Sequence, residues 1–563
     1  MIGQISEKFR TGTITVVLSL GSGLLAVSFM LLVNLIYDQT ILSFSLRSRS
    51  FFLGASLAVV MSTSLVAGLL LRFISPEAAG SGIPQVKASY WKAMGQIDLK
   101  AGLVKYVAGA ISIGGGTSLG REGPSVFLGS ALASNLSGWF GFGRRQRRGP
   151  VAVGASSALA AAFNAPLASI TFIIEEIVGD LHSRHLGSVI LASVTGAFVV
   201  HAIIGRQPAF KMASVADLSW NHYLVIPVAS LLASLAGIVF VKLTLALRDR
   251  FRGINLLPLW FKPMIGGLTT WIIGIGIFMI TGRLGVFGLG YQDLSDVLNN
   301  NFAWKAAGLL LAGKLIATVV SYASGGCGGI FAPSLFLGGM SGFFVAGLFS
   351  QWINLQPSDH IILAAVGMTA CLGAVVRAPL TSLLIVFEMT HQFELVPGLL
   401  LATLVSQGLS HLLAGRLNFY EALLVQDGHE LHKVKPPLDL RSWQNLPVSA
   451  IANYRPVVIA STAPEEMKKV IEKYPYNNFP LVQDGRVVGV LSREKIKSFL
   501  SGKSPLEIWP AIFCNEEETI KEIGNRFVES PSNILLVRKA DNETLVGIIT
   551  LHDLIRAQVA VEE

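Results

Sequence analysis

The sequence predicts a mainly α-helical polytopic membrane protein with a small α/β unit at its C-terminus. Of its 563 residues, 52% are hydrophobic and only 14% are charged, whereas soluble domains carry about 25% charged residues. Two blocks of apolar sequence occur twice in the same order, and the composition turns polar after residue 424. These observations predict two repeated membrane halves within residues 1–424, followed by a soluble region.

The N-terminal region contains two plain membrane spans, residues 14–37 and 51–74. Lys8 and Arg10 precede the first span, which is too long for the apolar part of a cleaved signal peptide. Because basic residues gather on the cytoplasmic side of membrane helices, we expect the N-terminus in the cytoplasm. The same rule accounts for the net charge of +9, so the charge does not indicate a nucleic-acid partner.

Several of the remaining apolar segments are short and interrupted by glycine and proline. Residues 101–116 and 380–389 are too short to cross a hydrocarbon layer of about 30 Å as straight helices. Short, broken helices that meet inside the membrane are a common way to build an ion site.

The internal repeat is visible in two pairs of blocks. Residues 124–129 (PSVFLG) match 333–338 (PSLFLG), and residues 164–167 (NAPL) match 377–380 (RAPL). Duplicated halves are typical of secondary transporters and channels, which place the site between the halves.

A glutamate follows each copy of the second block at the same distance. Glu175 and Glu388 each lie nine positions after the proline of that block. Because the repeat mates share this place, we expect Glu175 to be a structural carboxylate. The next residue, Glu176, has no acidic mate, since Met389 occupies the paired position.

Residues 120–124 (GREGP) predict a helix start inside the apolar region, with Pro124 as its first residue and Phe140 near its end. Gly120 and Gly123 leave the backbone bare, and the free N–H groups of a helix N-terminus attract an anion. Glu122 lies where that anion would bind, which suggests a gate. The alternative is that Glu122 only satisfies the helix dipole.

The soluble region predicts a linker over 425–445 and two repeats, 446–503 and 504–563. Expected strand pairs are 479–482 with 487–491, and 534–537 with 545–549. Expected capping boxes begin the helices at Thr462 with Glu465, and at Asn515 with Glu518. Each repeat is short for a core of its own, so we expect the two to pack together as one α/β unit.

The polar residues within the spans give no sign of catalysis. Cys327, Cys371 and Cys514 follow no spacing pattern, so the sequence predicts neither a disulfide framework nor a metal site. Neither a paired His/Asp metal set nor a Ser–His arrangement occurs in the spans, so we do not expect an enzyme.

Four separate stretches resemble the CLC chloride channel and transporter family: residues 80–84 (GSGIP), 120–124 (GREGP), 329–333 (GIFAP) and the isolated Tyr420. The C-terminal repeat resembles the pair of CBS modules that many members carry. The resemblance implies a homodimer in which each protomer has its own anion path. That path lies between two inverted halves of tilted, broken helices.

The resemblance also implies roles for individual residues. The hydroxyls of Ser81 and Tyr420 and the backbone N–H groups of Ile330 and Phe331 would bind a central chloride. Alternatives are that Ser81 only caps a helix and that Tyr420 is an interfacial aromatic anchor.

Two glutamates would carry the proton. The resemblance makes Glu122 the extracellular gate and Glu176 the inner proton acceptor of an exchanger, although Glu176 could also be a surface charge at a helix end. We expect Arg121 to be a structural ion-pair partner. Lys105 lies in an apolar segment and must pair or face water, but the sequence does not identify its partner.

In the second CBS repeat, Thr550 and Asp553 fit the pattern G-h-h-T-x-x-D, whose aspartate can bond a ribose. The first repeat has Ser492, but Lys495 stands in place of the aspartate. One intact half leaves two readings open, an adenine-nucleotide site and a scaffold that stabilises a dimer.

These inferences predict an antiporter that exchanges chloride for protons and requires no cofactor. One rival is a passive chloride channel of the same fold, against which Glu176 argues. Another is a nucleotide-sensing CBS protein whose membrane part is an anchor, which leaves the four pore motifs unexplained. We expect a prokaryotic inner membrane, with both termini in the cytoplasm.

Overall fold

The computed structural model describes residues 2–143, 146–179, 185–205, 210, 212, 220–254, 257–413, 415, 417–429, 446–538 and 544–554, apart from the side chains of 2–9 and 528. The chain divides into two compact units, Met1–Val434 and Lys435–Glu563. Most of the predicted linker lies outside the described residues, and each unit is considered by itself.

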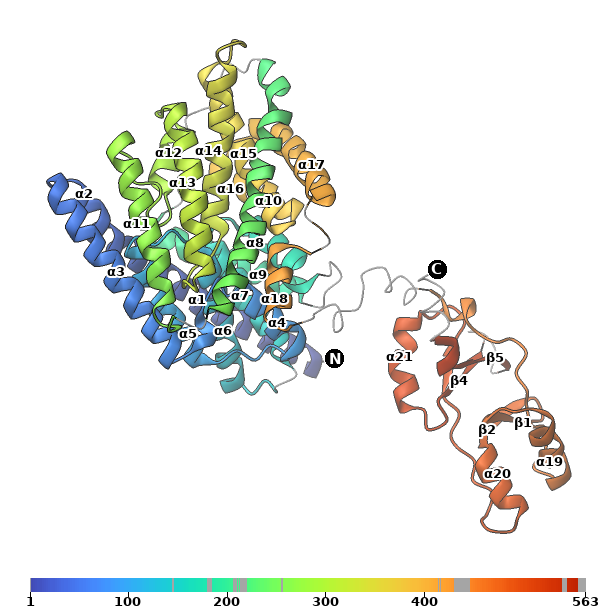
Figure 1. The fold of residues 1–563 in the computed structure, drawn as a ribbon. Coiled ribbons are helices and arrows are strands. Elements are labelled where there is room, and N and C mark those ends of the chain that lie inside the picture. The colour runs from blue at the N-terminus through green and yellow to red at the C-terminus, as the bar shows by residue number, and fades with distance from the viewer. Residues whose placement is uncertain are drawn as a thin grey trace. The chain divides into compact units, whose positions relative to one another are not determined.

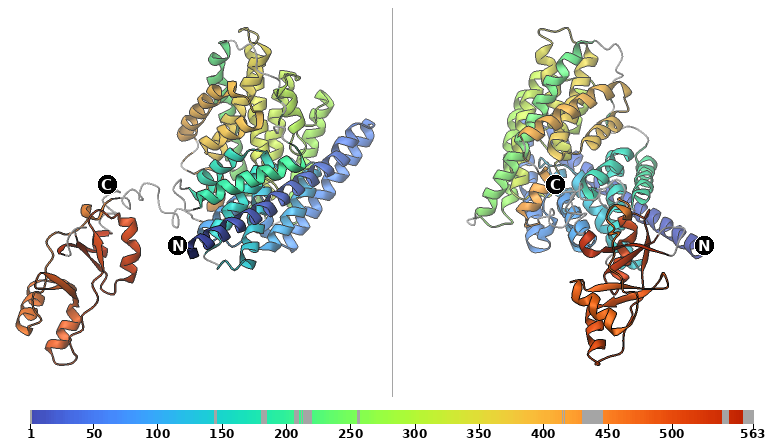
Figure 2. Two further views of the ribbon diagram at one scale, coloured as in Figure 1. Left: turned by 180° about the vertical axis from the view of Figure 1, so that it is seen from behind. Right: turned by 90° about the vertical axis from the view of Figure 1, so that its right-hand side faces the viewer.

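The N-terminal half of the first unit consists of helices of very different lengths (Figure 1). They are α1 (Ile2–Tyr37), η1 (Asp38–Leu42), α2 (Ser43–Ser45), α3 (Arg49–Phe73), η2 (Pro76–Ala78), α4 (Ile83–Lys92), α5 (Leu99–Gly114), α6 (Glu122–Trp139), α7 (Arg148–Phe163), α8 (Pro166–Phe172), η4 (Ile173–Val178) and α9 (Leu186–Ile203). The long helix α1, dark blue in Figure 2, packs against α6, α7 and α9.

The second half repeats this alternation of long and short helices. It contains α10 (Asn221–Gly253), α11 (Lys262–Thr281), α12 (Tyr291–Leu298), α13 (Trp304–Ala323), α14 (Phe331–Phe349), α15 (Pro357–Val376), α16 (Pro379–Thr390), η5 (Phe393–Leu395), α17 (Val396–Leu413) and α18 (Phe419–Gln426). Among the described residues, nine helices are long and apolar enough to cross a membrane. The apolar windows of α14 and α15 are 89% and 94% buried, so these helices form the centre of the unit.

The two halves meet at a pair of repeat mates. Gly120 and Gly329 form an antiparallel bridge, with N–H···O distances of 2.7 and 2.6 Å. Each glycine lies two positions before the first residue of a helix, α6 in one half and α14 in the other. These two helices carry the two copies of the first repeat block, PSVFLG and PSLFLG, written PSxFLG below. Equivalent segments of the two halves therefore run in opposite directions where they meet, as in a pair of inverted halves.

Glu175 and Glu388 make a reciprocal exchange between the halves. Oε1 and Oε2 of Glu175 accept hydrogen bonds from the N–H groups of Leu380 and Thr381, at 3.1 and 2.9 Å. Oε1 and Oε2 of Glu388 accept from the first N–H groups of α8, at 3.0 and 2.7 Å. Each carboxylate therefore caps the short helix of the opposite half, and the geometry agrees with the expected structural role of Glu175.

Lys105 and Lys314 are also equivalent, since each lies 19 positions before the proline of its PSxFLG block. Lys105 Nζ donates to the Gly80 carbonyl at 2.9 Å, and Lys314 Nζ donates to the Gly288 carbonyl at 2.6 Å. Both ammonium groups lie over a phenylalanine ring, 5.0 and 5.3 Å from the ring centroid. The partner of Lys105 is therefore a backbone carbonyl of the GSGIP loop.

The C-terminal unit contains two small sheets. Strands β1 (Asn478–Gln483) and β2 (Arg486–Ser492) pair antiparallel, while β4 (Ile534–Arg538) lies between β3 (Phe513–Asn515) and β5 (Leu545–Thr550). The helices are η8 (Val448–Ala450), α19 (Pro464–Lys473), α20 (Arg493–Leu500) and α21 (Ile520–Glu529). Val490 shares a buried cluster with Ile534 and Leu536, so the two halves pack together as expected.

Both predicted capping boxes of this unit are wrong. Helix α19 begins at Pro464 after Ala463, whose side chain cannot accept a capping hydrogen bond. Helix α21 is capped by Thr519 with Glu522, four residues after the expected start. Residues 516–518 form a turn between β3 and α21, and Asn515 is the last residue of β3 rather than a helix cap.

Candidate functional site

The candidate site lies where α6 and α14 begin. Helix α6 begins at Glu122, two residues before the predicted start at Pro124, and α14 begins at Phe331 in the equivalent place. The bridge between Gly120 and Gly329 holds these two N-termini close together. The first N–H groups of both helices therefore present partial positive charge to one buried region.

Gly120 and Gly123 allow this close approach. A Cβ atom at Gly123 would lie 2.3 Å from the Ser81 hydroxyl oxygen. A Cβ at Gly120 would lie 2.8 Å from Oε2 of Glu122 and 3.2 Å from the backbone nitrogen of Ala332. The Glu122 carboxylate and the first turn of α14 thus border the same small space.

Ser81 and Tyr420 bring two hydroxyl groups to this region. Both side chains are buried, the two hydroxyls lie close to each other, and neither makes a hydrogen bond of good geometry within the described residues. Tyr420 lies within electrostatic range of Glu122 and Glu176. Because a buried hydroxyl without a partner is costly, these two groups fit a bound anion that accepts from both.

The alternative roles of Ser81 and Tyr420 do not fit their positions. Helix α4 begins at Ile83 after Gly82, which is left-handed with φ of 94°, and no side chain caps it. Tyr420 is 0% exposed and packs near Phe331, with ring centroids 6.5 Å apart. Ser81 is therefore not a helix cap, and Tyr420 is not an interfacial anchor.

Glu122 is 0% exposed and is held by a tyrosine that the sequence did not point to. The hydroxyl of Tyr291, the first residue of α12, donates to Oε1 of Glu122 at 2.5 Å. Oε2 has no partner within the described residues. Arg121 Nε lies 4.0 Å from Oε1, while its Nη1 donates to Asn34 at 2.8 Å. Arg121 was expected to be a structural ion-pair partner, and its ion pair is a long contact with Glu122.

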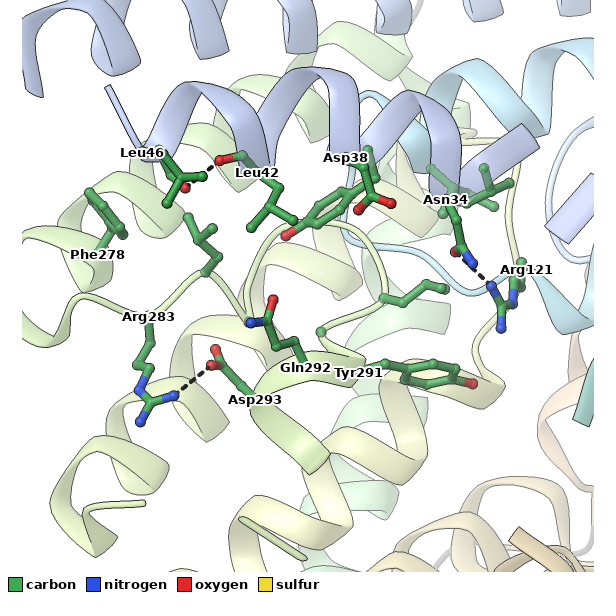
Figure 3. Close-up of a pocket in the computed structure, with 18 of the residues that line it drawn as sticks. Asn34, Asp38, Leu42, Leu46, Arg121, Phe278, Arg283, Tyr291, Gln292 and Asp293 are labelled. Carbon is green, nitrogen blue, oxygen red and sulfur yellow. Dashed lines mark hydrogen bonds and ion pairs between the residues drawn. The ribbon is translucent and has the colours of Figure 1, made fainter. Parts of the chain in front are cut away.

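A cavity of about 620 Å³ lies against two residues that contact Glu122 (Figure 3). Arg121 and Tyr291, which both contact Glu122, line it. Figure 3 shows the Arg121–Asn34 contact and an Arg283–Asp293 ion pair in its wall.

A second cavity, of about 500 Å³, reaches the opposite side of the site. Gly80 and Tyr322 line it. Tyr322 accepts a hydrogen bond from the backbone N–H of Ser81 at 3.4 Å. One cavity is thus lined by residues that contact Glu122, and the other by a residue that contacts Ser81.

Glu176 is buried rather than exposed at a helix end, with 2% of its side chain accessible. It lies in the π-helical turn η4, a distortion often found at functional sites. Lys87 Nζ donates to its Oε1 at 2.8 Å, and Asn418 Nδ2 donates to its Oε2 at 2.7 Å. Lys87 also contacts Oε1 of Glu421 at 3.1 Å.

In the C-terminal unit, Thr550 and Asp553 contact each other. The Asp553 carboxylate accepts from the Thr550 N–H at 2.8 Å and from its hydroxyl at 2.7 Å. In the first repeat, Lys495 forms an exposed ion pair with Glu507 at 2.5 Å. A ribose would have to share the Asp553 carboxylate with the helix start.

Sequence reasoning missed Lys87, Tyr291, Asn418 and Glu421. The charges of Lys87 and Glu421 within a membrane unit were a usable signal, because such residues are costly and need a partner. Tyr291 could also have been found from the sequence. It follows Gly288 and Gly290, which are the repeat counterparts of the two glycines of GSGIP.

A fold of duplicated halves, with broken helices that meet inside the unit, is the architecture of a membrane ion transporter or channel. The model of the voltage gated chloride channel family matches residues 63–411, and that of the CBS domain matches residues 507–560. This chain belongs to the voltage-gated chloride channel family, and it is a multi-pass membrane protein. The expected family and fold class are confirmed.

Relatives of this chain are named both as channels and as exchangers. A voltage-gated ClC-type chloride channel, ClcB of Salmonella dublin, is 32% identical over 62% of this chain and 82% of its own length. An H(+)/Cl(-) exchange transporter, ClcA of Klebsiella pneumoniae, is 30% identical over 70% of this chain and 84% of its own length.

Solved structures give the same fold. A slow cyanobacterial Cl-/H+ antiporter has a TM-score of 0.65 and 26% identity, covering 75% of this chain and 98% of its own. A eukaryotic CLC transporter has a TM-score of 0.62 and 20% identity, covering 98% of both chains.

Proposed function

We propose that this chain exchanges chloride for protons across a membrane. The observation that carries this proposal is the position of Glu122. Its carboxylate lies at the N-terminus of α6 near the first turn of α14, and the next residue, Gly123, lies close to the Ser81 hydroxyl. Names of relatives alone do not decide between exchange and passive flow, since both kinds occur among them.

The anion site would consist of partial charges rather than a formal cation. Chloride would accept from the hydroxyls of Ser81 and Tyr420 and from the N–H groups of Ile330 and Phe331. Such donors compensate a buried anion and still allow it to leave, whereas a fixed lysine would hold it tightly.

Glu122 would then act as the gate. Its ionised carboxylate competes with chloride for the same donors, and protonation removes that competition. One event therefore releases the gate and loads a proton, which couples the two ions in opposite directions.

Glu176 supports exchange over a passive channel. A buried carboxylate in contact with a buried lysine is costly to maintain, and a simple anion pore has no use for it. As the inner proton acceptor, Glu176 would supply protons to Glu122 by a route separate from the chloride cavities.

The test uses purified protein in liposomes with an imposed chloride gradient and a pH electrode outside. We expect protons to move uphill, driven by chloride. Glu122→Gln and Glu176→Gln should each abolish proton movement while chloride still flows. Glu175→Gln is the matched control, because this neighbouring carboxylate caps α16, and its variant should keep coupling.

Other results would assign a different function. Chloride flux without proton movement in the unaltered protein would make it a passive channel. Tight nucleotide binding with no ion flux in folded protein would make it a membrane-anchored nucleotide sensor.

The proposal extends to the assembly and its setting. We expect a homodimer in a prokaryotic inner membrane with both termini in the cytoplasm, no required cofactor, and separate CBS repeats at 446–503 and 504–563. An adenine nucleotide would bond through its ribose to Asp553 beside Thr550. A thermal shift with ATP that Asp553→Ala removes supports this site, and the absence of any shift favours the scaffold.

A further inference from the structure

Four residues from three separate elements form one buried polar network around Glu176. Lys87 of α4 contacts Glu176 of η4 at 2.8 Å and Glu421 of α18 at 3.1 Å. Asn418 closes the network, because its Nδ2 donates to Glu176 at 2.7 Å and its Oδ1 accepts from the Glu421 N–H at 2.8 Å. One ammonium group therefore bridges two carboxylates.

Exposure differs sharply across the network. The side chains of Lys87 and Glu176 are each 2% exposed, whereas that of Glu421 is 33% exposed. Glu421 is thus the acidic member of this group that meets solvent, and Lys87 separates it from Glu176.

The net charge of Lys87 and its carboxylate partners determines whether the group can take up a proton. A buried pair of Lys87 and Glu176 alone would be neutral, and a proton on Glu176 would leave a buried cation without a counter-ion, which is strongly unfavourable. With Glu421 present, the ionised group carries a net charge of −1. One added proton makes it neutral, and the lysine keeps a carboxylate partner.

Three arginines near α18 have partners of their own. Arg377 lies within electrostatic range of Glu421, but its guanidinium donates to the carbonyls of Gly415 and Ser410. On α10, Arg248 and Arg252 pair with Asp427, at the other end of α18.

We propose that Glu421 and Lys87 form, together with Glu176, the proton-loading group of this transporter, in which Glu421 takes the proton from water. Transfer moves along two hydrogen bonds. Lys87 gives an N–H proton to Glu176, forming its O–H bond, and then takes the proton from Glu421, whose O–H bond breaks. The Lys87 ammonium is restored, and one proton has moved from Glu421 to Glu176. This inference rests on the proposed exchange function.

The first test is Glu421→Gln in the liposome assay. Glutamine can serve in the capping box with Asn418, so the start of α18 should be preserved. We expect chloride flux close to that of the unaltered protein. Proton movement should fall by about tenfold or more, because each unit of altered proton affinity changes occupancy tenfold.

A double variant separates the relay from structure. Lys87→Gln combined with Glu421→Gln removes both residues that hand the proton to Glu176. We expect proton movement no lower than in Glu421→Gln alone, because the relay is already broken in the single variant, whereas two independent structural losses would add. Glu175→Gln is the control for altering an adjacent carboxylate.

The outcomes distinguish the two proposals. If the unaltered protein moves no protons, the proposed exchange function fails. If it couples normally and Glu421→Gln couples equally well, only this inference fails. Loss of chloride flux in Glu421→Gln, or a double variant in which proton movement falls well below that of the single variant, would also overturn it, since the losses would then be structural.

Discussion

The Tyr291 hydroxyl donates a 2.5 Å hydrogen bond to the carboxylate of Glu122, across 169 positions of sequence. Tyr291 directly follows a loop whose glycines, Gly288 and Gly290, are left-handed with φ of 52° and 78°. The repeat counterpart of that loop is GSGIP, which carries Ser81. Equivalent loops therefore precede the residue that holds the proposed gate, Glu122, in one half and carry the Ser81 hydroxyl in the other.

Removing this hydrogen bond should favour release of the gate. Tyr291→Phe keeps the ring but deletes a donor to a charged carboxylate, and such bonds contribute about 1.5–3 kcal/mol. If the bond forms only with the gate in its present position, chloride flux at neutral pH should rise by about tenfold. Chloride efflux from liposomes measures this.

Tyr106→Phe is the matched control for that variant. The Tyr106 hydroxyl contacts Ser28 at 3.2 Å, at an exposed position, so its loss should leave flux unchanged. An unchanged or lower flux in Tyr291→Phe would mean that this hydrogen bond does not restrain Glu122.

Gly123→Ala should block the anion site. Its Cβ would lie 2.3 Å from the Ser81 hydroxyl and 3.3 Å from the Gly329 Cα, so the hydroxyl or the backbone must move. We expect chloride flux to fall at least tenfold, as a misplacement of about 1 Å in a binding geometry costs up to a hundredfold.

The control for that variant is Gly276→Ala in α11, where an added Cβ meets nothing within 4 Å. It should leave flux intact. Normal chloride flux in Gly123→Ala would show that the Ser81 hydroxyl is not required at its present position.

The carboxylates of Glu175 and Glu388 should contribute comparably to stability. Each accepts the first N–H groups of a helix in the opposite half, and loss of such a cap costs about 1 kcal/mol. Glu388→Gln and Glu175→Gln should both lower the thermal unfolding temperature in detergent by a similar amount. Loss of proton coupling in Glu388→Gln without any change in stability would contradict the capping role.

Cys514 in β3 should remain an unreactive thiol in the folded protein. Burial, reinforced by Glu518, raises the pKa of the Cys514 thiol to about 12 from its ordinary 9.0. Only the thiolate reacts with maleimides or iodoacetamide, so labelling at pH 8 should be slow in native protein and fast in urea. Peptide mass spectrometry identifies this site, and rapid native labelling would contradict its burial.

The same shift has a consequence for stability. The folded pKa of Cys514 lies above the unfolded value, so its contribution is complete below pH 9.0 and is lost as pH rises toward about 12. In Cys514→Ala, the fall of the unfolding temperature over this window should be shallower than in the unaltered protein.

Much of the fold could be predicted from the sequence because it depends on local and periodic properties. Apolar length predicted membrane helices, and short hydrophobic runs in a repeat predicted the strand pairs of the C-terminal unit. The PSxFLG repeat predicted equivalent halves. The helix starts were placed less well, since Pro124 lies in the third position of α6 rather than the first, and either position tolerates its missing N–H.

The partners of the buried charges could not be predicted in the same way. Lys87 and Glu421 are 334 positions apart, and no local pattern relates them. Tyr291 reaches Glu122 only because α12 and α6 belong to halves that fold against each other. Contacts of this kind depend on how the helices pack, which a single sequence does not state.

By itself, the sequence determined the membrane class, the repeated halves, the family and the stretches around Ser81, Glu122 and Tyr420. These follow from hydropathy, repetition and residue type, which are properties of neighbouring positions along the chain. Only the tertiary structure decided that Glu122 is held by Tyr291 and that Glu176 shares a lysine with Glu421. A buried charge takes whichever partner packing brings within reach, so its role is settled by folding.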